Sequence, residues 1–134
     1  MYSYEVKLRV QYYETDQMGV VHHSNYIRYY ETARTELMRS LGVSYHDMEA
    51  SGIMMPIISA SSKYIQPALY DEEITVKAIV KELPTSRIRF FYEIYNQTGK
   101  LINEGETLLA FVNMQTQRPV RAPELLTGKL VHLF

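Results

Sequence analysis

Residues 24–42, SNYIRYYETARTELMRSLG, place apolar side chains at steps of three and four. The recurring residues are Tyr26, Tyr30, Ala33, Leu37 and Leu41. One continuous apolar stripe of this kind predicts an amphipathic helix over about 25–41. Ser24 is the expected N-cap, because its hydroxyl accepts from a free amide of the first turn. Gly42 suits the left-handed residue that ends a helix.

The segments on either side of this helix alternate with a period of two, which predicts strands. Residues 4–12 alternate before the helix, and the strands expected after it cover 53–65, 73–82, 86–96 and 101–115. Two shorter helices are expected, near 44–51 and from Pro123 onward, since proline is favoured at a first helical position. Pro56 lies near the start of its strand, where a missing amide does least harm.

One strand, one long helix and four hairpin-linked strands predict an α+β fold with an antiparallel sheet and a helix on one of its faces. The length of 134 residues fits a single domain over 1–134. Several side chains expected on the outer face of the sheet are apolar, namely Ile79, Phe91, Tyr95, Leu109 and Phe111. We therefore expect an oligomer that buries this face.

The composition excludes several classes of function. There is no cysteine, so disulfides, thiolate zinc sites and a cysteine nucleophile are excluded. A net charge of -1 provides no basic field for nucleic acid or anionic membrane. The alternating N-terminus reads as a strand rather than a signal peptide, and no apolar run is long enough to span a membrane. We expect a cytoplasmic protein.

The loop before the main helix holds the candidate chemistry. Cleavage of an acyl bond requires a nucleophile or general base and donors for the developing oxyanion. Asp16 meets the first need, either by attacking the carbonyl directly or by activating a water. The free amides at the start of the helix, around His23, meet the second. Gly19 fits a tight turn that brings the backbone close to a substrate.

Other interpretations of these residues stay open. Asp16 in a loop before a helix is also the residue type that forms an Asx-turn. His22 and His23 make a weak metal pair, because neighbours in an extended chain point in opposite directions and no third ligand is evident. A triad of Ser24, His23 and Asp16 has no nucleophile-elbow signature to support it. Glu31 on the helix is a second candidate base.

The run from Tyr13 to Tyr26, YETDQMGVVHHSNY, and its continuation from Tyr30 to Arg34, YETAR, resemble the signature of the 4-hydroxybenzoyl-CoA thioesterase family. The similarity is strongest to its bacterial acyl-CoA branch, which includes the Tol-Pal-associated enzymes. The resemblance implies a hot-dog fold, in which an antiparallel five- to six-stranded sheet wraps around one long central helix. It also implies a homodimer or homotetramer with active sites at the dimer interface.

The resemblance further implies hydrolysis of a small or medium acyl-CoA, with Asp16 as nucleophile or general base and the His23 amide polarising the thioester carbonyl. The family's histidine also falls at His23. The expected oxyanion and substrate-positioning residues are Gly19, Ser24, Asn25 and Tyr26. Met18 is bulkier than the family's usual residue before the glycine, which affects the acyl pocket rather than the mechanism. No metal or redox cofactor is expected, since coenzyme A enters as part of the substrate.

The phosphates of coenzyme A require cations, and the sequence offers Lys63, Arg87 and Arg89. A charged strand face in water explains each of them equally well. Three alternatives to an acyl-CoA thioesterase stay open. They are an acyl-ACP thioesterase, another hot-dog enzyme such as a hydroxyacyl dehydratase, and a non-catalytic module that binds acyl-CoA or nucleic acid. The net charge of -1 disfavours nucleic acid.

Overall fold

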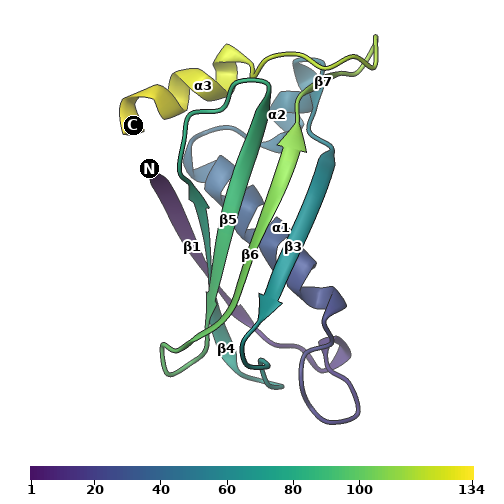
Figure 1. The fold of residues 1–134 in the computed structure, drawn as a ribbon, viewed down its shortest axis with the longest axis vertical. Coiled ribbons are helices and arrows are strands. Elements are labelled where there is room, and N and C mark those ends of the chain that lie inside the picture. Colours follow the sequence, from purple (N-terminus) through teal and green to yellow (C-terminus); the bar gives the residue numbers. More distant parts are fainter.

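The computed structural model describes all residues from Met1 to Phe134, and it is built from seven strands, three α-helices and two 3₁₀ turns (Figure 1). Strands are β1 (Tyr2–Arg9), β2 (Ile53–Met54), β3 (Ile57–Tyr64), β4 (Glu73–Val80), β5 (Arg87–Tyr95), β6 (Leu101–Ala110) and β7 (Val112–Asn113). Helices are α1 (Ser24–Ser40), α2 (Tyr45–Ala50) and α3 (Glu124–Leu130), and the 3₁₀ turns are η1 (Tyr12–Glu14) and η2 (Val131–Leu133).

Five strands form one antiparallel sheet in the order β1-β4-β5-β6-β3. Strands β2 and β7 form a separate two-stranded sheet. Helix α1, 17 residues long, packs on one face of the larger sheet, and in Figure 1 it lies behind the strands. No helix in the structure has the length and apolar character needed to cross a membrane.

The predicted apolar stripe of α1 is confirmed, since Tyr26, Tyr30, Ala33 and Leu37 are all buried against the sheet. The helix ends as expected at Gly42, whose φ is +81°. The amide of Gly42 donates to the Arg39 carbonyl and that of Val43 donates to the Met38 carbonyl. These two bonds form a Schellman motif, which satisfies carbonyls that the last turn would otherwise leave free.

Three predicted strands are shorter or broken in the structure. The first ends at Arg9, because residues 12–14 turn into η1 and leave Tyr12 77% exposed rather than on the buried face. Residues 53–65 divide at Pro56 into β2 and β3, and residues 101–115 divide at Phe111 into β6 and β7. In both cases one part of the segment belongs to the large sheet and the other part to the small one.

Leu109 and Phe111 are buried core residues, so the prediction that they lie on the outer face is wrong. The reason is an irregularity in the pairing of β5 with β6, where Tyr95 pairs with Leu101 but Ile94 pairs with Asn103. The extra residue, Ile102, reverses the alternation along β6. Ile79 and Phe91 do lie opposite each other on the outer face, as expected, although Ile79 is only 5% exposed.

Strand β3 is a free edge of the sheet, with apolar side chains at its two ends and small or polar side chains between them. Its outer side has no partner strand, and the side chains exposed along it and just beyond its end include Ile57, Ile58, Tyr64 and Ile65. Ile58, for example, is 47% exposed. A free edge presents unpaired backbone groups that favour association with another strand.

Candidate active site

The loop between β1 and α1 folds into a small hairpin that carries Asp16 at its tip. Thr15 pairs with Val21, and the Asp16 amide donates to the Val20 carbonyl at 2.9 Å. Gly19 closes the turn with a φ of +76°, a conformation that glycine adopts without steric cost. The local sequence therefore fixes the backbone on both sides of Asp16.

The Asp16 carboxylate is exposed, and one of its oxygens has a structural role. Oδ1 accepts the Met18 amide at 2.8 Å and the Val20 amide at 3.4 Å, which is the Asx-turn that the residue type also suggested. Oδ2 has no hydrogen-bond partner within the chain. The carboxylate is thus held in one orientation by Oδ1, while Oδ2 is free to meet a substrate or a water.

Helix α1 begins at Ser24, and its N-cap position is occupied by His23 rather than by Ser24 as predicted. His22 takes over the capping role: its Nδ1 accepts the Ser24 amide at 3.3 Å and lies 2.8 Å from the Ser24 hydroxyl. The His22 carbonyl accepts the Asn25 amide at 3.0 Å. The chain supplies no acceptor for the His23 amide, which is therefore a free donor at the positive end of the helix.

A cavity of about 220 Å³ lies next to His23. Its wall comes from the start of α1 and from the segment at the end of β3, and its lining includes Val21, His23, Tyr26, Tyr64 and Ile65. The cavity is therefore bounded on one side by the free edge of the sheet. A thioester lying in it would be next to the helix start and next to whatever covers that edge.

Asn25 and Tyr26 hold the walls of the site in place. The Asn25 side-chain Nδ2 donates to the Glu14 carbonyl at 2.9 Å, which ties the hairpin to the helix. The Tyr26 hydroxyl accepts the Ala68 amide at 3.2 Å, which ties the helix to the segment after β3. Both side chains are buried. Through these contacts Asn25 and Tyr26 position the hairpin and the segment after β3 relative to the start of α1.

Glu14 is a site residue that the sequence reasoning missed. Its Oε1 accepts the Gln11 amide at 2.8 Å and the Tyr29 hydroxyl at 3.1 Å, and its carbonyl accepts the His22 amide at 2.9 Å. The pKa of the Tyr29 phenol is raised, mainly by burial and secondly by the nearby charge of Glu14. The phenol therefore stays protonated and donates its hydrogen bond to Glu14. The spacing of Gln11 and Glu14 is that of a capping pair and was the available signal.

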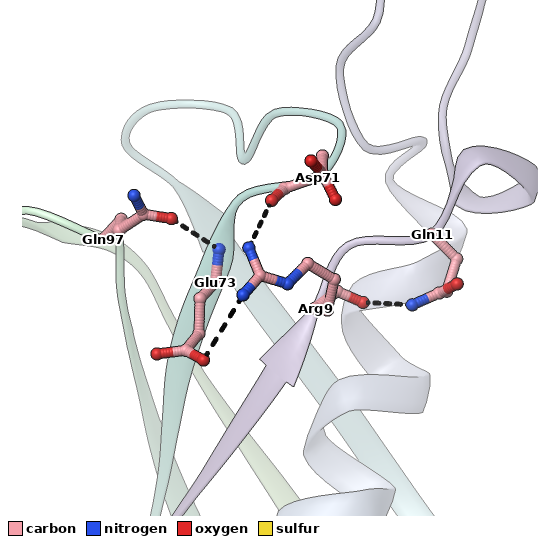
Figure 2. A network of polar contacts seen from close by, with 5 residues as sticks. All are labelled: Arg9, Gln11, Asp71, Glu73 and Gln97. Carbon is pink, nitrogen blue, oxygen red and sulfur yellow. Dashed lines mark hydrogen bonds and ion pairs between the residues drawn. The ribbon is translucent and has the colours of Figure 1, made fainter.

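The segment after β3 supports the hairpin from the other side. The Tyr70 amide donates to the Gly19 carbonyl at 3.0 Å, and Val20 pairs with Leu69. Figure 2 shows how this segment is joined to β1: Arg9 donates to the Asp71 carbonyl at 2.7 Å and lies 3.7 Å from the Glu73 carboxylate. The Asp16 turn consequently rests on a framework built from two distant parts of the chain.

The structure does not assemble the triad of Ser24, His23 and Asp16, because Ser24 bonds to His22 instead. The two histidine rings lie next to each other and tilted, with centroids 4.2 Å apart and an angle of 31° between their planes. The expectation that they point in opposite directions is wrong, since His23 already has helical dihedral angles. No group of three or more His, Asp or Glu side chains is arranged around a possible metal position.

The predicted cations lie away from this cavity within one chain. Arg87 pairs with Ala110, whose amide donates to the Pro56 carbonyl before β3, whereas the cavity lies at the other end of β3. A strand of 8 residues spans roughly 26 Å at about 3.3 Å per residue. Arg89 forms an ion pair with Glu106 at 3.0 Å on the outer face. Lys63 is next to Tyr64 but also on the outer face, opposite Glu104.

Comparison with known proteins places this geometry in a family. Residues 10–130 match the model of the thioesterase-like superfamily. The chain is 31% identical over 121 residues to "Putative acyl-CoA thioesterase YneP" of Bacillus subtilis, covering 90% of this chain and 88% of that protein. It is 28% identical over 122 residues to "Acyl-CoA thioester hydrolase YbgC" of Escherichia coli, covering 91% of each.

A solved structure agrees with these sequence matches. The DHNA-CoA thioesterase from Staphylococcus aureus superimposes with a TM-score of 0.86 at 36% identity, covering 90% of this chain and 81% of that one. The chain therefore belongs to the thioesterase-like superfamily and is a thioester hydrolase of the hot-dog fold.

Proposed function

We propose that this chain hydrolyses the thioester of a small or medium acyl-CoA to the free acid and coenzyme A. The observation that carries the proposal is the unpaired His23 amide at the start of α1, next to a cavity and close along the chain to the oriented Asp16 carboxylate. The names of the relatives support the substrate class. The finer resemblance, to the 4-hydroxybenzoyl-CoA branch and its Tol-Pal-associated members, stays a prediction.

In the proposed reaction the thioester carbonyl accepts a hydrogen bond from the His23 amide. As a general base, Asp16 takes a proton from a water that attacks the carbonyl carbon, and the tetrahedral intermediate then expels the coenzyme A thiolate, which takes up that proton. As a nucleophile, Asp16 instead attacks the carbonyl carbon and expels the coenzyme A thiolate, which leaves a mixed anhydride. Water then hydrolyses the anhydride and restores the Asp16 carboxylate, and the thiolate takes up a proton from that water. Both routes consume one water and release one acid and one thiol.

We further propose that the site is completed by a second copy of the chain across β3. Asp16 and His23 are exposed in one chain, whereas an acyl-transfer site functions best when water is excluded. Antiparallel pairing of two β3 strands would bury the free edge and set Tyr64 of one copy near Ile57 of the other. The same pairing would carry one copy's Arg87 and Arg89 toward the active-site end of the other. A further pairing of dimers into a tetramer stays a prediction.

The remaining expectations are kept as proposals. We propose one domain over residues 1–134, a cytoplasmic location and no metal or redox cofactor. Lys63, Arg87 and Arg89 are the proposed contacts for the phosphates of coenzyme A. Acyl groups on a carrier protein have the same pantetheine thioester, and a substrate panel should therefore include an acyl-ACP.

The direct test is thiol release from a panel of acyl thioesters by the wild type and by Asp16→Asn. The Asn side chain keeps an oxygen for the Met18 and Val20 amides, so the turn should be retained while turnover falls by about 10²–10⁴. Asp47→Asn is the matched control, because Asp47 also accepts a backbone amide, from Ser44, at the distant helix α2. Near-native turnover by Asp16→Asn would remove Asp16 from the mechanism.

Strand pairing is tested separately by Ile58→Lys, which places a charge on the free edge. Sedimentation should then report a monomer and thiol release should fall. Leu125→Lys on α3 is the control, since this residue is similarly exposed but far from β3. An unchanged oligomer in the Ile58 variant would contradict the pairing.

A further inference from the structure

Arg34 is a buried cation with no ionic partner. Its side chain comes from the middle of α1, and the residue is 3% exposed. Nε donates to the Tyr45 hydroxyl at 2.6 Å, and Nη1 donates to the Tyr92 hydroxyl at 3.1 Å. No Asp or Glu oxygen lies within 4.0 Å of the guanidinium. Buried charges in proteins are normally paired, and this arginine is an exception.

The two phenols do not neutralise the guanidinium. Burial raises the pKa of both Tyr45 and Tyr92, so each hydroxyl is uncharged near neutral pH. A guanidinium has five N–H donors, and three of those on Arg34 have no acceptor in the chain. No fully buried side-chain nitrogen in the structure lacks a partner, so Nη2, which has none, is not fully enclosed, and Arg34 lines a pocket.

This second pocket has a volume of about 230 Å³ and lies between α1, α2, β2 and the start of β3. Three charged residues, Glu31, Arg34 and Glu49, line it, and the other lining residues are hydrophobic, namely Tyr45, Met48, Ile53, Met54, Met55 and Ile57. Glu31 and Glu49 also line the pocket, but both are exposed, so water screens their charges far more than that of the buried arginine. Methionine side chains adapt to ligands of different shape.

The pocket has a defined position relative to the proposed active site. Ile57 is at the start of β3 and Tyr64 at its end, and both side chains are on the α1 side of the strand. Antiparallel pairing of two β3 strands therefore brings the Arg34 pocket of one copy toward the His23 cavity of the other. An acyl group whose thioester is in the cavity would extend into this pocket.

We propose that the Arg34 pocket binds the far end of the acyl group and selects substrates that carry a carboxylate there, that is, ω-carboxyacyl thioesters. This inference rests on the proposed hydrolysis of acyl-CoA and on the β3 pairing. The carboxylate would accept two parallel bonds from the guanidinium fork, at a distance where no side chain of the protein forms an ion pair with Arg34. An alkyl end would leave the same donors unpaired, which is how such sites reject a substrate that lacks the polar group.

The test compares kcat/KM for pairs of acyl-CoAs of equal chain length, one ending in a carboxylate and one in a methyl group, from four to eight carbons. The wild type should prefer the carboxylate member of at least one pair by about tenfold or more. Arg34→Met, which keeps the length of the side chain, should abolish that preference, and Arg34→Lys should retain part of it. No preference at any length, or one that survives in Arg34→Met, would overturn the proposal.

Met54→Glu provides a test that leaves Arg34 in place. Met54 also lines the pocket, and a carboxylate there would pair with Arg34 and reduce the preference for a carboxylate substrate. A second measurement needs no turnover. Glutarate and pentanoate are each titrated into the wild-type protein, and binding is measured from the NMR chemical shifts of the Met48 and Ile53 amides. Shifts with glutarate alone would support the pocket even if no thioester is hydrolysed; equal shifts with both, or none with either, would refute it.

Discussion

Gly105 on β6 is the position where the smallest substitution should have the largest effect on stability. The residue lies between Tyr92 of β5 and Ser62 of β3, and the Tyr30 ring of α1 packs directly over it. A Cβ built at Gly105 overlaps both the hydroxyl and the ring of Tyr30. Gly105→Ala therefore forces α1 or Tyr30 away from the sheet.

The cost is estimated from the contacts that Tyr30 would lose. Its hydroxyl bonds to Ser62 at 2.7 Å and to Asn103, and its ring stacks on Tyr92 with centroids 4.4 Å apart. Overpacking of a core costs about 1–3 kcal/mol, and each lost hydrogen bond adds about 0.5–1.5 kcal/mol. Alanine also restricts the unfolded chain more than glycine does, and this lower conformational entropy offsets about 0.4–1 kcal/mol of the loss. We expect a net loss of about 1–5 kcal/mol in the free energy of unfolding.

Urea unfolding at fixed protein concentration measures this loss directly. Gly128→Ala in α3 is the matched control, because the nearest atom to its added Cβ is the Glu124 Cγ at 3.9 Å. That variant should be more stable than the wild type by about 0.5–1 kcal/mol, since alanine favours a helix. Overpacking alone should cost at least about 1 kcal/mol. If the free energy of unfolding of Gly105→Ala is within about 0.5 kcal/mol of the wild-type value, Tyr30 does not pack on β6 as described.

Three further measurements test the site and its supports. Asn25→Ala should lower the free energy of unfolding by about 1–3 kcal/mol and slow thiol release, because the Glu14 carbonyl loses its side-chain donor; an unaffected variant would remove Asn25 from the site framework. Hydrogen bonds from the backbone and side chain of Ser44 hold the pKa of Asp47 below its ordinary value of 3.8. The stability that the Asp47 carboxylate contributes to α2 is therefore fully present above pH 3.8 and is lost as the pH falls through the lowered pKa. Asp47→Asn should flatten the acid limb of stability against pH, and an identical limb in both proteins would contradict the assignment. Arg87→Ala or Arg89→Ala should raise KM for coenzyme A esters more than for a pantetheine thioester, whereas equal changes would exclude both from phosphate binding.

Local patterns predicted the elements of this fold well where neighbouring residues decide the outcome. The apolar stripe from Tyr26 to Leu37, the left-handed end at Gly42 and the inward faces of β4 and β5 all follow from periodicity and backbone preference. The cap at Ser24 was predicted wrongly because Ser24 is already the first helical residue and its hydroxyl lies 2.8 Å from the His22 Nδ1. This contact depends on how the hairpin enters the helix, which residue preferences do not describe.

The sequence by itself determined that Asp16 and the start of a helix lie in one loop, and it did so because they are close along the chain. Only the tertiary structure decided that the His23 amide is free, that Arg34 is buried without an acid, and that Arg87 lies far from the loop. It also decided, through the extra residue at Ile102, that Leu109 and Phe111 face the core. The physical reason is the same in each case: strand register and the packing of distant segments set these environments, and no local period encodes them.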